Sequence, residues 1–150
     1  MWPNVQKQVA IDRANINQLF TSYAFVLDGL SEEDPGFIET SALSTMLHSF
    51  YNGIENIFKR VALEIDGNIP SGAASHSALL SSMTQPTDNR PPLISITMQN
   101  QLSAYLSFRH AFRHMYTFHL KWSKMHSLVV ESEETWQKLQ IELDLFFIQS

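Results

Sequence analysis

The apolar residues between positions 43 and 65 repeat with the period of an α-helix. They recur at intervals of three or four residues, in the order Leu43, Leu47, Phe50, Ile54, Ile57, Val61 and Ile65. This spacing places these side chains on one stripe of a long helix, and such a stripe has to be buried against neighbouring helices. Pro35-Gly36 precede the segment and Gly67 follows it, as is typical of the two ends of a helix. The chain is therefore predicted to contain a long helix that packs in a bundle.

Two further helices are predicted on either side of this segment. Apolar residues keep the helical period from Val5 to Asp28-Gly29, and a short acidic connection follows at 31–34. The first helix should therefore pack antiparallel to the helix at 43–65. A short helix is predicted around Ser75 to Met83.

The rest of the chain is predicted to add two more long helices. A fourth helix runs from about Leu93 to the region of Tyr116, and the last begins at Ser132, whose hydroxyl would cap it. Glu133 and Glu134 in the first turn favour this start. No alternating pattern typical of strands competes with these helices. All 150 residues are therefore predicted to form one all-α domain, a bundle of four main helices plus a short one.

The composition excludes several classes of protein. The absence of cysteine excludes disulfide frameworks and thiolate metal sites. The first residues, MWPNVQKQVAIDRAN, carry charges where a signal peptide needs an apolar core, and no segment approaches the ~20 apolar residues of a membrane span. A net charge of -5 argues against a protein that coats nucleic acid without selectivity. We expect a cytoplasmic protein that does not enter a membrane.

The charge is distributed unevenly along the sequence. Between positions 89 and 130 there is no Asp or Glu, but there are four histidines and five cations, which are Arg90, Arg109, Arg113, Lys121 and Lys124. The rest of the chain holds the other five cations and all fifteen acidic residues. A basic segment on an acidic body predicts one surface that faces an anion.

The predicted fourth helix concentrates these cations beside apolar residues. Its apolar face consists of Tyr105, Phe108, Phe112 and Met115. Arg109, Arg113 and Tyr116 lie along one edge of this face. A single arginine at such a position usually covers apolar surface with its stem and reaches water with its head. Two arginines one turn apart, with histidines close by and no nearby carboxylate in the sequence, are more typical of a site that awaits an anion.

The order of residues in this segment resembles the signature of the HEPN superfamily of helical-bundle ribonucleases. Arg109 is followed after four residues by His114, and a polar residue, His110, comes directly after the arginine. Tyr116 extends the pattern to the form of the HepT-like toxins. Four sequence segments are also similar to successive blocks of HepT-like proteins. In chain order, these are FYNGIENIFKRVALEIDG, SHSALL, RPP and FRHAFRHMY. The resemblance covers about residues 43–147.

This resemblance implies a HEPN-type bundle that acts as a metal-independent endoribonuclease on tRNA or mRNA, without a cofactor. RNA carries its own nucleophile, the 2'-hydroxyl, so cleavage needs a base and cations that stabilise the charge developing on phosphorus. We assign acid–base chemistry to His114, because an imidazole titrates near neutral pH, and the phosphoryl clamp to Arg109. His110, Arg113 and Lys121 are expected to support phosphate or RNA binding. The expected products are a 2',3'-cyclic phosphate and a 5'-hydroxyl.

The resemblance also implies protein partners. The HEPN proteins that this segment resembles form two-fold dimers whose paired motifs line a shared cleft. We therefore expect a homodimer through the fourth-helix region. HepT-like toxins are silenced by a minimal nucleotidyltransferase antitoxin, in some cases by transfer of AMP onto the tyrosine that corresponds to Tyr116. A phosphate attached there would compete for Arg109 and Arg113.

The spacing of Arg109 and His114 poses a geometrical problem. Five residues on a straight helix separate two side chains by about 140°, so the pair cannot converge on one phosphate. Either the helix ends or bulges near His114, or the site is assembled from two chains around a two-fold axis.

The remaining histidines are assigned simpler roles. His48 and His76 are expected to be structural, with His76 capping or packing the short helix. His119 and His126 either extend the basic surface toward RNA or are solvated. The two histidines of the signature lack the intervening Glu of the HExxH zinc pattern, so no metal site is predicted.

Two other function classes stay open. One is a non-catalytic HEPN-like module that binds a nucleotide or a nucleotidyltransferase partner, which the acidic net charge favours because it weakens non-specific affinity for RNA. The other is an all-α interaction protein whose basic helix pairs with an acidic partner. The combination of Arg109, His114 and Tyr116 favours the ribonuclease, since a scaffold has no chemical need for it.

Overall fold

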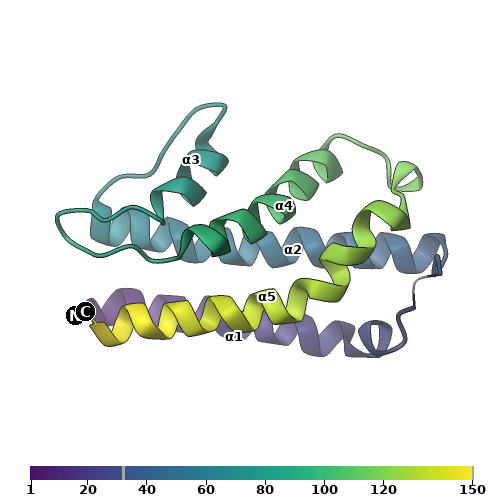
Figure 1. Cartoon of the computed structure of the whole chain (residues 1–150), viewed down its shortest axis with the longest axis horizontal. Helices are drawn as coiled ribbons and strands as arrows, with labels where there is room; N and C mark the ends of the chain where they lie inside the picture. The colour runs from purple at the N-terminus through teal and green to yellow at the C-terminus, as the bar shows by residue number, and fades with distance from the viewer. Residues whose placement is uncertain (32, 150) are drawn as a thin grey trace.

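The computed structural model describes residues 1–31 and 33–149, and every element named within them is a helix (Figure 1). The four long helices are α1 (Pro3–Asp28), α2 (Phe37–Val61), α4 (Ile96–Arg113) and α5 (Trp122–Gln149). The shorter elements are the π-helical turn η1 (Ala62–Asp66), α3 (Ser75–Ser82) and the 3-10 turn η2 (Thr117–His119). The prediction of an all-α bundle is confirmed over these residues. The acidic connection predicted at 31–34 includes Glu32, which lies outside the described residues.

The four long helices run along the length of the molecule, and each is roughly antiparallel to the next (Figure 1). α1 and α2 pack against each other as predicted, and α5 returns along α1. The start of α1 and the end of α5 therefore lie together (Figure 1). The ring of Trp2 stacks there on that of Phe146, with centroids 5.5 Å apart. α3 lies at one end of the bundle beside α2 and α4. None of the described helices is both long and apolar enough to cross a membrane.

The apolar stripe of α2 forms the centre of the hydrophobic core. All of the residues that define it, from Leu43 to Ile65, are buried. Phe50 illustrates the arrangement, because its ring contacts one aromatic ring from each of the other long helices. These rings are Phe20 of α1, Tyr105 of α4 and Trp136 of α5, with centroids 5.4, 5.3 and 6.4 Å away. α2 is therefore surrounded by the other three long helices.

α2 continues through η1 and ends at Gly67, as predicted. Gly67 has φ +84°, a left-handed conformation that glycine adopts without steric cost. The N–H of Asn68 then donates to the carbonyl of Ala62 at 3.1 Å and closes the helix end. The turn η1 places Asp66 next to the loop between α3 and α4.

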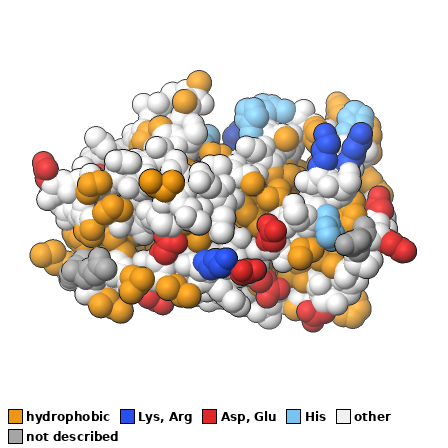
Figure 2. Space-filling model, in the orientation of Figure 1, with side chains coloured by type: hydrophobic (Ala, Val, Ile, Leu, Met, Phe, Trp, Pro, Cys, Tyr) orange, Lys and Arg blue, Asp and Glu red, His pale blue; other side chains and the backbone are white. Residues whose placement is uncertain are grey.

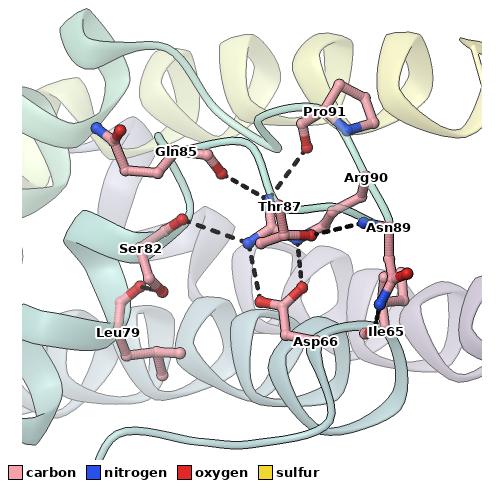
Figure 3. Close-up of polar contacts among 9 residues, drawn as sticks. All are labelled: Ile65, Asp66, Leu79, Ser82, Gln85, Thr87, Asn89, Arg90 and Pro91. Carbon is pink, nitrogen blue, oxygen red and sulfur yellow. Dashed lines mark hydrogen bonds and ion pairs between the residues drawn. The ribbon is translucent and has the colours of Figure 1, made fainter.

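Arg90 is a buried structural residue, so the prediction that includes it in the anion-facing surface is wrong. Its side chain is 0% exposed, and its Nε and Nη2 donate to Oδ1 and Oδ2 of Asp66 at 2.7 and 2.9 Å (Figure 3). Its N–H groups also donate to the carbonyls of Ser82, Gln85 and Pro91 at 3.1 to 3.3 Å (Figure 3). A guanidinium group paired in this bidentate way is fully used inside the protein. Arg90 therefore fixes the loop between α3 and α4 onto η1.

α4 is shorter than predicted at both ends. It begins at Ile96, because the hydroxyl of Ser95 accepts from the N–H of Met98 at 3.0 Å and caps the helix. It ends at Arg113 and does not reach Tyr116.

The prediction for the start of the last helix is wrong. α5 begins at Trp122, and Ser132 lies inside it, fully buried, with its hydroxyl donating to the carbonyl of Val129 at 2.7 Å. Trp122, Met125 and Val129 are buried and continue the apolar stripe toward the N-terminal end of α5. A serine inside a helix can donate to a carbonyl of its own helix. In the sequence, however, Ser132 interrupts the run of large apolar residues and resembles an N-terminal cap, which is why the predicted start is too late.

Candidate functional site

The last turns of α4 and the residues after it carry the predicted catalytic segment. Arg109, His110 and Arg113 lie on the helix, whereas His114 is its C-terminal cap residue, with φ −117° and ψ 9°. The helix therefore ends near His114, which is one of the two solutions to the spacing problem. Tyr116 lies beyond the helix end, so the helical spacing that placed it on the same edge as Arg109 does not apply.

A neutral side chain holds Arg109 in place. Nε of Arg109 donates to Oδ1 of Asn52 on α2 at 2.6 Å, and Nδ2 of Asn52 lies 3.0 Å from Nε2 of His48. A guanidinium group has only donors, so the amide oxygen of Asn52 must face it and the amide nitrogen must face His48. Nε2 of His48 then accepts a hydrogen bond, which requires a neutral imidazole with its proton on Nδ1.

The surroundings of His48 favour this neutral form. Burial lowers the pKa of His48, and the positive charges of Arg109 and Arg113 lower this pKa further. The ring packs against Phe112, with centroids 5.0 Å apart, and Nδ1 is buried without a hydrogen-bond partner in the part of the chain that the structure describes. His48 therefore ends a chain of two hydrogen bonds that orients Arg109, which is more than the structural role expected from the sequence.

Arg109 and Arg113 differ from the other three arginines in their partners. Arg13, Arg60 and Arg90 each pair with an aspartate, at N–O distances of 2.8, 2.5 and 2.7 Å. Within residues 1–31 and 33–149, no ion pair involves Arg109 or Arg113. Their positive charge is therefore not neutralised by a carboxylate of the described chain.

A surface hollow of about 300 Å³ lies beside these two cations, and we call it the α3–α4 hollow. Its polar wall is formed by Ser107, Arg109, His110 and Arg113 of α4 and by His76 and Ser77 of α3. The structure therefore brings together three predicted site residues, Arg109, His110 and Arg113, and adds His76. His114 is not among the lining residues, although its ring lies against that of His110, with centroids 4.9 Å apart.

His76 is tied to a buried carboxylate. Nδ1 of His76 lies 2.8 Å from Oε1 of Glu55 on α2, and Glu55 is only 2% exposed. Nζ of Lys59 lies 3.5 Å from the same oxygen. The N-terminal cap residue of α3 is Ala74, so His76 does not cap the helix and instead packs it against α2. Sequence reasoning did not find the position of His76 in the α3–α4 hollow, because no local spacing connects it with α4.

The residues after α4 form a separate, exposed group. Tyr116 is 71% exposed, and its ring stacks on that of Phe118 at 5.3 Å. His119 contacts both rings edge-on. Lys121 lines a second hollow at the start of α5, together with His126, so the structure does not place Lys121 with Arg109.

Charged side chains are distributed unevenly over the face of the molecule that Figure 2 shows, as they are along the sequence. Figure 2 shows most of the histidine and cationic side chains along the upper side, over α4 and the start of α5. Acidic side chains lie mostly over the middle, the sides and the lower edge (Figure 2).

We predict that His48→Gln makes stability less dependent on pH between 7 and 5. The pKa of His48 lies below its ordinary value of 6.5, so the unfolded state binds a proton at a higher pH than the folded state. The contribution of His48 to stability is therefore complete above about pH 6.5 and is lost as the pH falls through the folded pKa. The glutamine carbonyl can still accept from Asn52 but does not titrate. Urea unfolding at pH 7 and pH 5 measures the difference, with His119→Gln as the control; an unchanged pH dependence in His48→Gln would contradict the prediction.

Comparison with known proteins places the chain in a family. The sequence model of a family described as "HepT-like protein" matches residues 42–149, which is more than half of the chain. No curated protein and no solved structure matches the chain. The family match confirms the resemblance drawn from the ordered motifs, and the helical bundle agrees with it. The chain therefore belongs to the HepT-like family of the HEPN superfamily.

Proposed function

We propose that this HepT-like protein is a metal-independent endoribonuclease toxin that cleaves cellular RNA, either tRNA or mRNA. The arrangement of Arg109 supports the proposal most strongly. Its guanidinium group is oriented by the neutral amide of Asn52, and Arg113 lies beside it without a carboxylate partner in the described chain. Both arginines line the α3–α4 hollow together with imidazole groups. Oriented cations beside acid–base groups are what the cleavage of a phosphodiester requires.

The proposed chemistry uses the nucleophile that RNA already carries. The 2'-oxygen attacks phosphorus while a base takes its proton, and the 5'-oxygen leaves as a hydroxyl. Nε of Arg109 is occupied by Asn52, so the two terminal nitrogens are left to bind the non-bridging phosphate oxygens. Removing one such donor typically slows the chemical step by about 10²–10³-fold. His114 supplies acid–base chemistry, and the products are a 2',3'-cyclic phosphate and a 5'-hydroxyl.

We further propose that the active protein is a homodimer that pairs the ends of α4. His114 does not line the hollow that contains Arg109, so the end of α4 at His114 does not by itself place both groups in that hollow. The residues next to His114 are apolar and exposed: Met115, Tyr116 and Phe118 are 40%, 71% and 65% exposed. Burial of such residues between two copies would bring His114 of one chain toward Arg109 of the other.

A non-catalytic binding module is the second candidate. The net charge of -5 favours it, because an acidic protein has a weaker non-specific affinity for RNA. Such a module would bind a nucleotide or a nucleotidyltransferase partner in the α3–α4 hollow without cutting RNA. Such a module would leave a total RNA pool intact, whereas the ribonuclease would cleave it.

We predict that the wild type cleaves a total RNA pool and that His114→Ala and Arg109→Lys do not. Arg109→Lys keeps the charge but loses the Nε bond to Asn52 and the two parallel donors, so we expect cleavage to fall at least about 10²-fold. Arg13→Lys, at an arginine that pairs with Asp144, is the matched control and should cleave normally. Identical gel patterns for wild type and His114→Ala would mean that this segment is not catalytic.

Mixing the two inactive variants tests whether two chains share the site. A mixed dimer of Arg109→Lys and His114→Ala contains one site with both native groups if the residues act across the interface. Partial recovery of cleavage on mixing is therefore expected. No recovery of cleavage on mixing would contradict the shared site. Full cleavage by wild-type protein that light scattering shows to be monomeric at micromolar concentration would also contradict it.

We also propose that a minimal nucleotidyltransferase antitoxin transfers AMP from ATP to the hydroxyl of Tyr116, with pyrophosphate as the leaving group. The side chain is 71% exposed and lies just past the end of α4, where a bulky anion would obstruct RNA. Intact mass spectrometry after incubation with the cognate nucleotidyltransferase and ATP should show an adduct in wild type and in Tyr23→Phe, but not in Tyr116→Phe. An adduct that persists in Tyr116→Phe would rule out this assignment.

A further inference from the structure

His76 reaches the α3–α4 hollow from a different helix than Arg109 does. Arg109, His110 and Arg113 line it from α4, whereas His76 lines it from α3. The side chain of His76 is 36% exposed. Two imidazoles, those of His76 and His110, and two arginines without carboxylate partners in the described chain therefore line one hollow within a single chain.

The contact with Glu55 determines which ring nitrogen of His76 is free. An ionised carboxylate only accepts hydrogen bonds, so Nδ1 of His76 carries the proton that is donated to Oε1 of Glu55 at 2.8 Å. Within the described residues, no hydrogen bond occupies the other nitrogen, Nε2. In a neutral His76 the Nε2 nitrogen is therefore unprotonated, and His76 is one of the residues that line the hollow.

The contact between His76 and Glu55 fits a role in catalysis better than a role that only holds α3 against α2. Glu55 is buried and also lies 3.5 Å from Nζ of Lys59, so this carboxylate already has a cationic partner. A contact that only holds α3 against α2 needs one N–H donor, which the side chain of an asparagine or a glutamine would also supply. It does not need an imidazole that lines the same hollow as two arginines without carboxylate partners in the described chain. A carboxylate that fixes the tautomer of a histidine, whose other nitrogen is open, is the arrangement found for general bases in hydrolases.

We propose that His76 is the general base of the cleavage reaction, an inference that rests on the proposed function. Nε2 of His76 takes the proton of the RNA 2'-hydroxyl while the 2'-oxygen forms its bond to phosphorus. The bond from phosphorus to the 5'-oxygen breaks, and the leaving oxygen takes a proton from the imidazolium of His114. Arg109 and Arg113 bind the non-bridging oxygens throughout. His76 and His114 thereby have separate roles, and Glu55 acts as a positioning residue for His76.

The central test is His76→Asn, compared with wild type on one RNA substrate. The asparagine amide nitrogen occupies about the place of Nδ1 and can still donate to Glu55, so the contact between α3 and α2 is retained. We expect kcat to fall about 10²–10³-fold, KM to change less than about 2-fold, and added imidazole to restore part of the rate. The acidic limb of the wild-type pH–rate profile should disappear in the variant. Ser81→Asn, on the exposed side of α3, is the matched control and should behave as wild type.

A second measurement uses the wild-type protein and does not depend on the folding of the variant. A substrate with a 2'-O-methyl group at the scissile position binds but cannot be cleaved. Its binding should change the nitrogen-15 resonance of Nε2 of His76. An unchanged resonance at saturating RNA would overturn the proposal.

The outcomes separate this proposal from the proposed function. If wild type cleaves no RNA, both proposals fail. If wild type cleaves, Arg109→Lys does not, and His76→Asn keeps the wild-type rate and pH profile, only the role of His76 is wrong. If His76→Asn loses RNA binding together with activity, His76 is a binding residue and not the base.

Discussion

The burial of the apolar stripe of α2 determines the candidate site as well as the fold. A helix turns by a fixed angle per residue, so packing Phe50 and its neighbours against three helices also fixes where the adjacent edge of α2 points. His48, Asn52 and Glu55 lie on that edge. There Asn52 meets Arg109 of α4, and Glu55 meets His76 of α3. The polar contacts therefore depend on the same packing that forms the core.

The molecule uses its arginines in two physically different ways. Arg90 is buried and bound to both oxygens of Asp66, so its charge is neutralised and its effect is structural. Arg109 is oriented by the neutral Asn52, which fixes the guanidinium group without cancelling its charge. The lowered pKa of His48 reflects that remaining positive charge, after the larger effect of burial. A cation that is oriented but not neutralised is suited to bind a phosphate group.

The sequence predicted those features that depend on neighbouring residues. The stripe of α2, the end of the helix at Gly67 and the grouping of Arg109, His110 and Arg113 all follow from spacings within a few turns. The partners of these residues did not follow, because Asn52 is 57 positions from Arg109 and Glu55 is 21 positions from His76. Such contacts depend on how the helices pack. The start of α5 was missed for a local reason, since buried Ser132 replaces a large apolar residue within the stripe.

The variant Asn52→Asp tests most directly whether a neutral partner keeps the charge of Arg109 available for phosphate. The substitution keeps the size of the side chain and its acceptor oxygen, but it adds the carboxylate that this arginine lacks in the described chain. RNA cleavage should fall by at least about 10²-fold, because the new ion pair neutralises Arg109. The substitution also removes the Nδ2 donor that faces His48, so urea unfolding of the variant checks that the protein remains folded. Cleavage by Asn52→Asp at the wild-type rate would show that the unneutralised charge of Arg109 is not what drives the reaction.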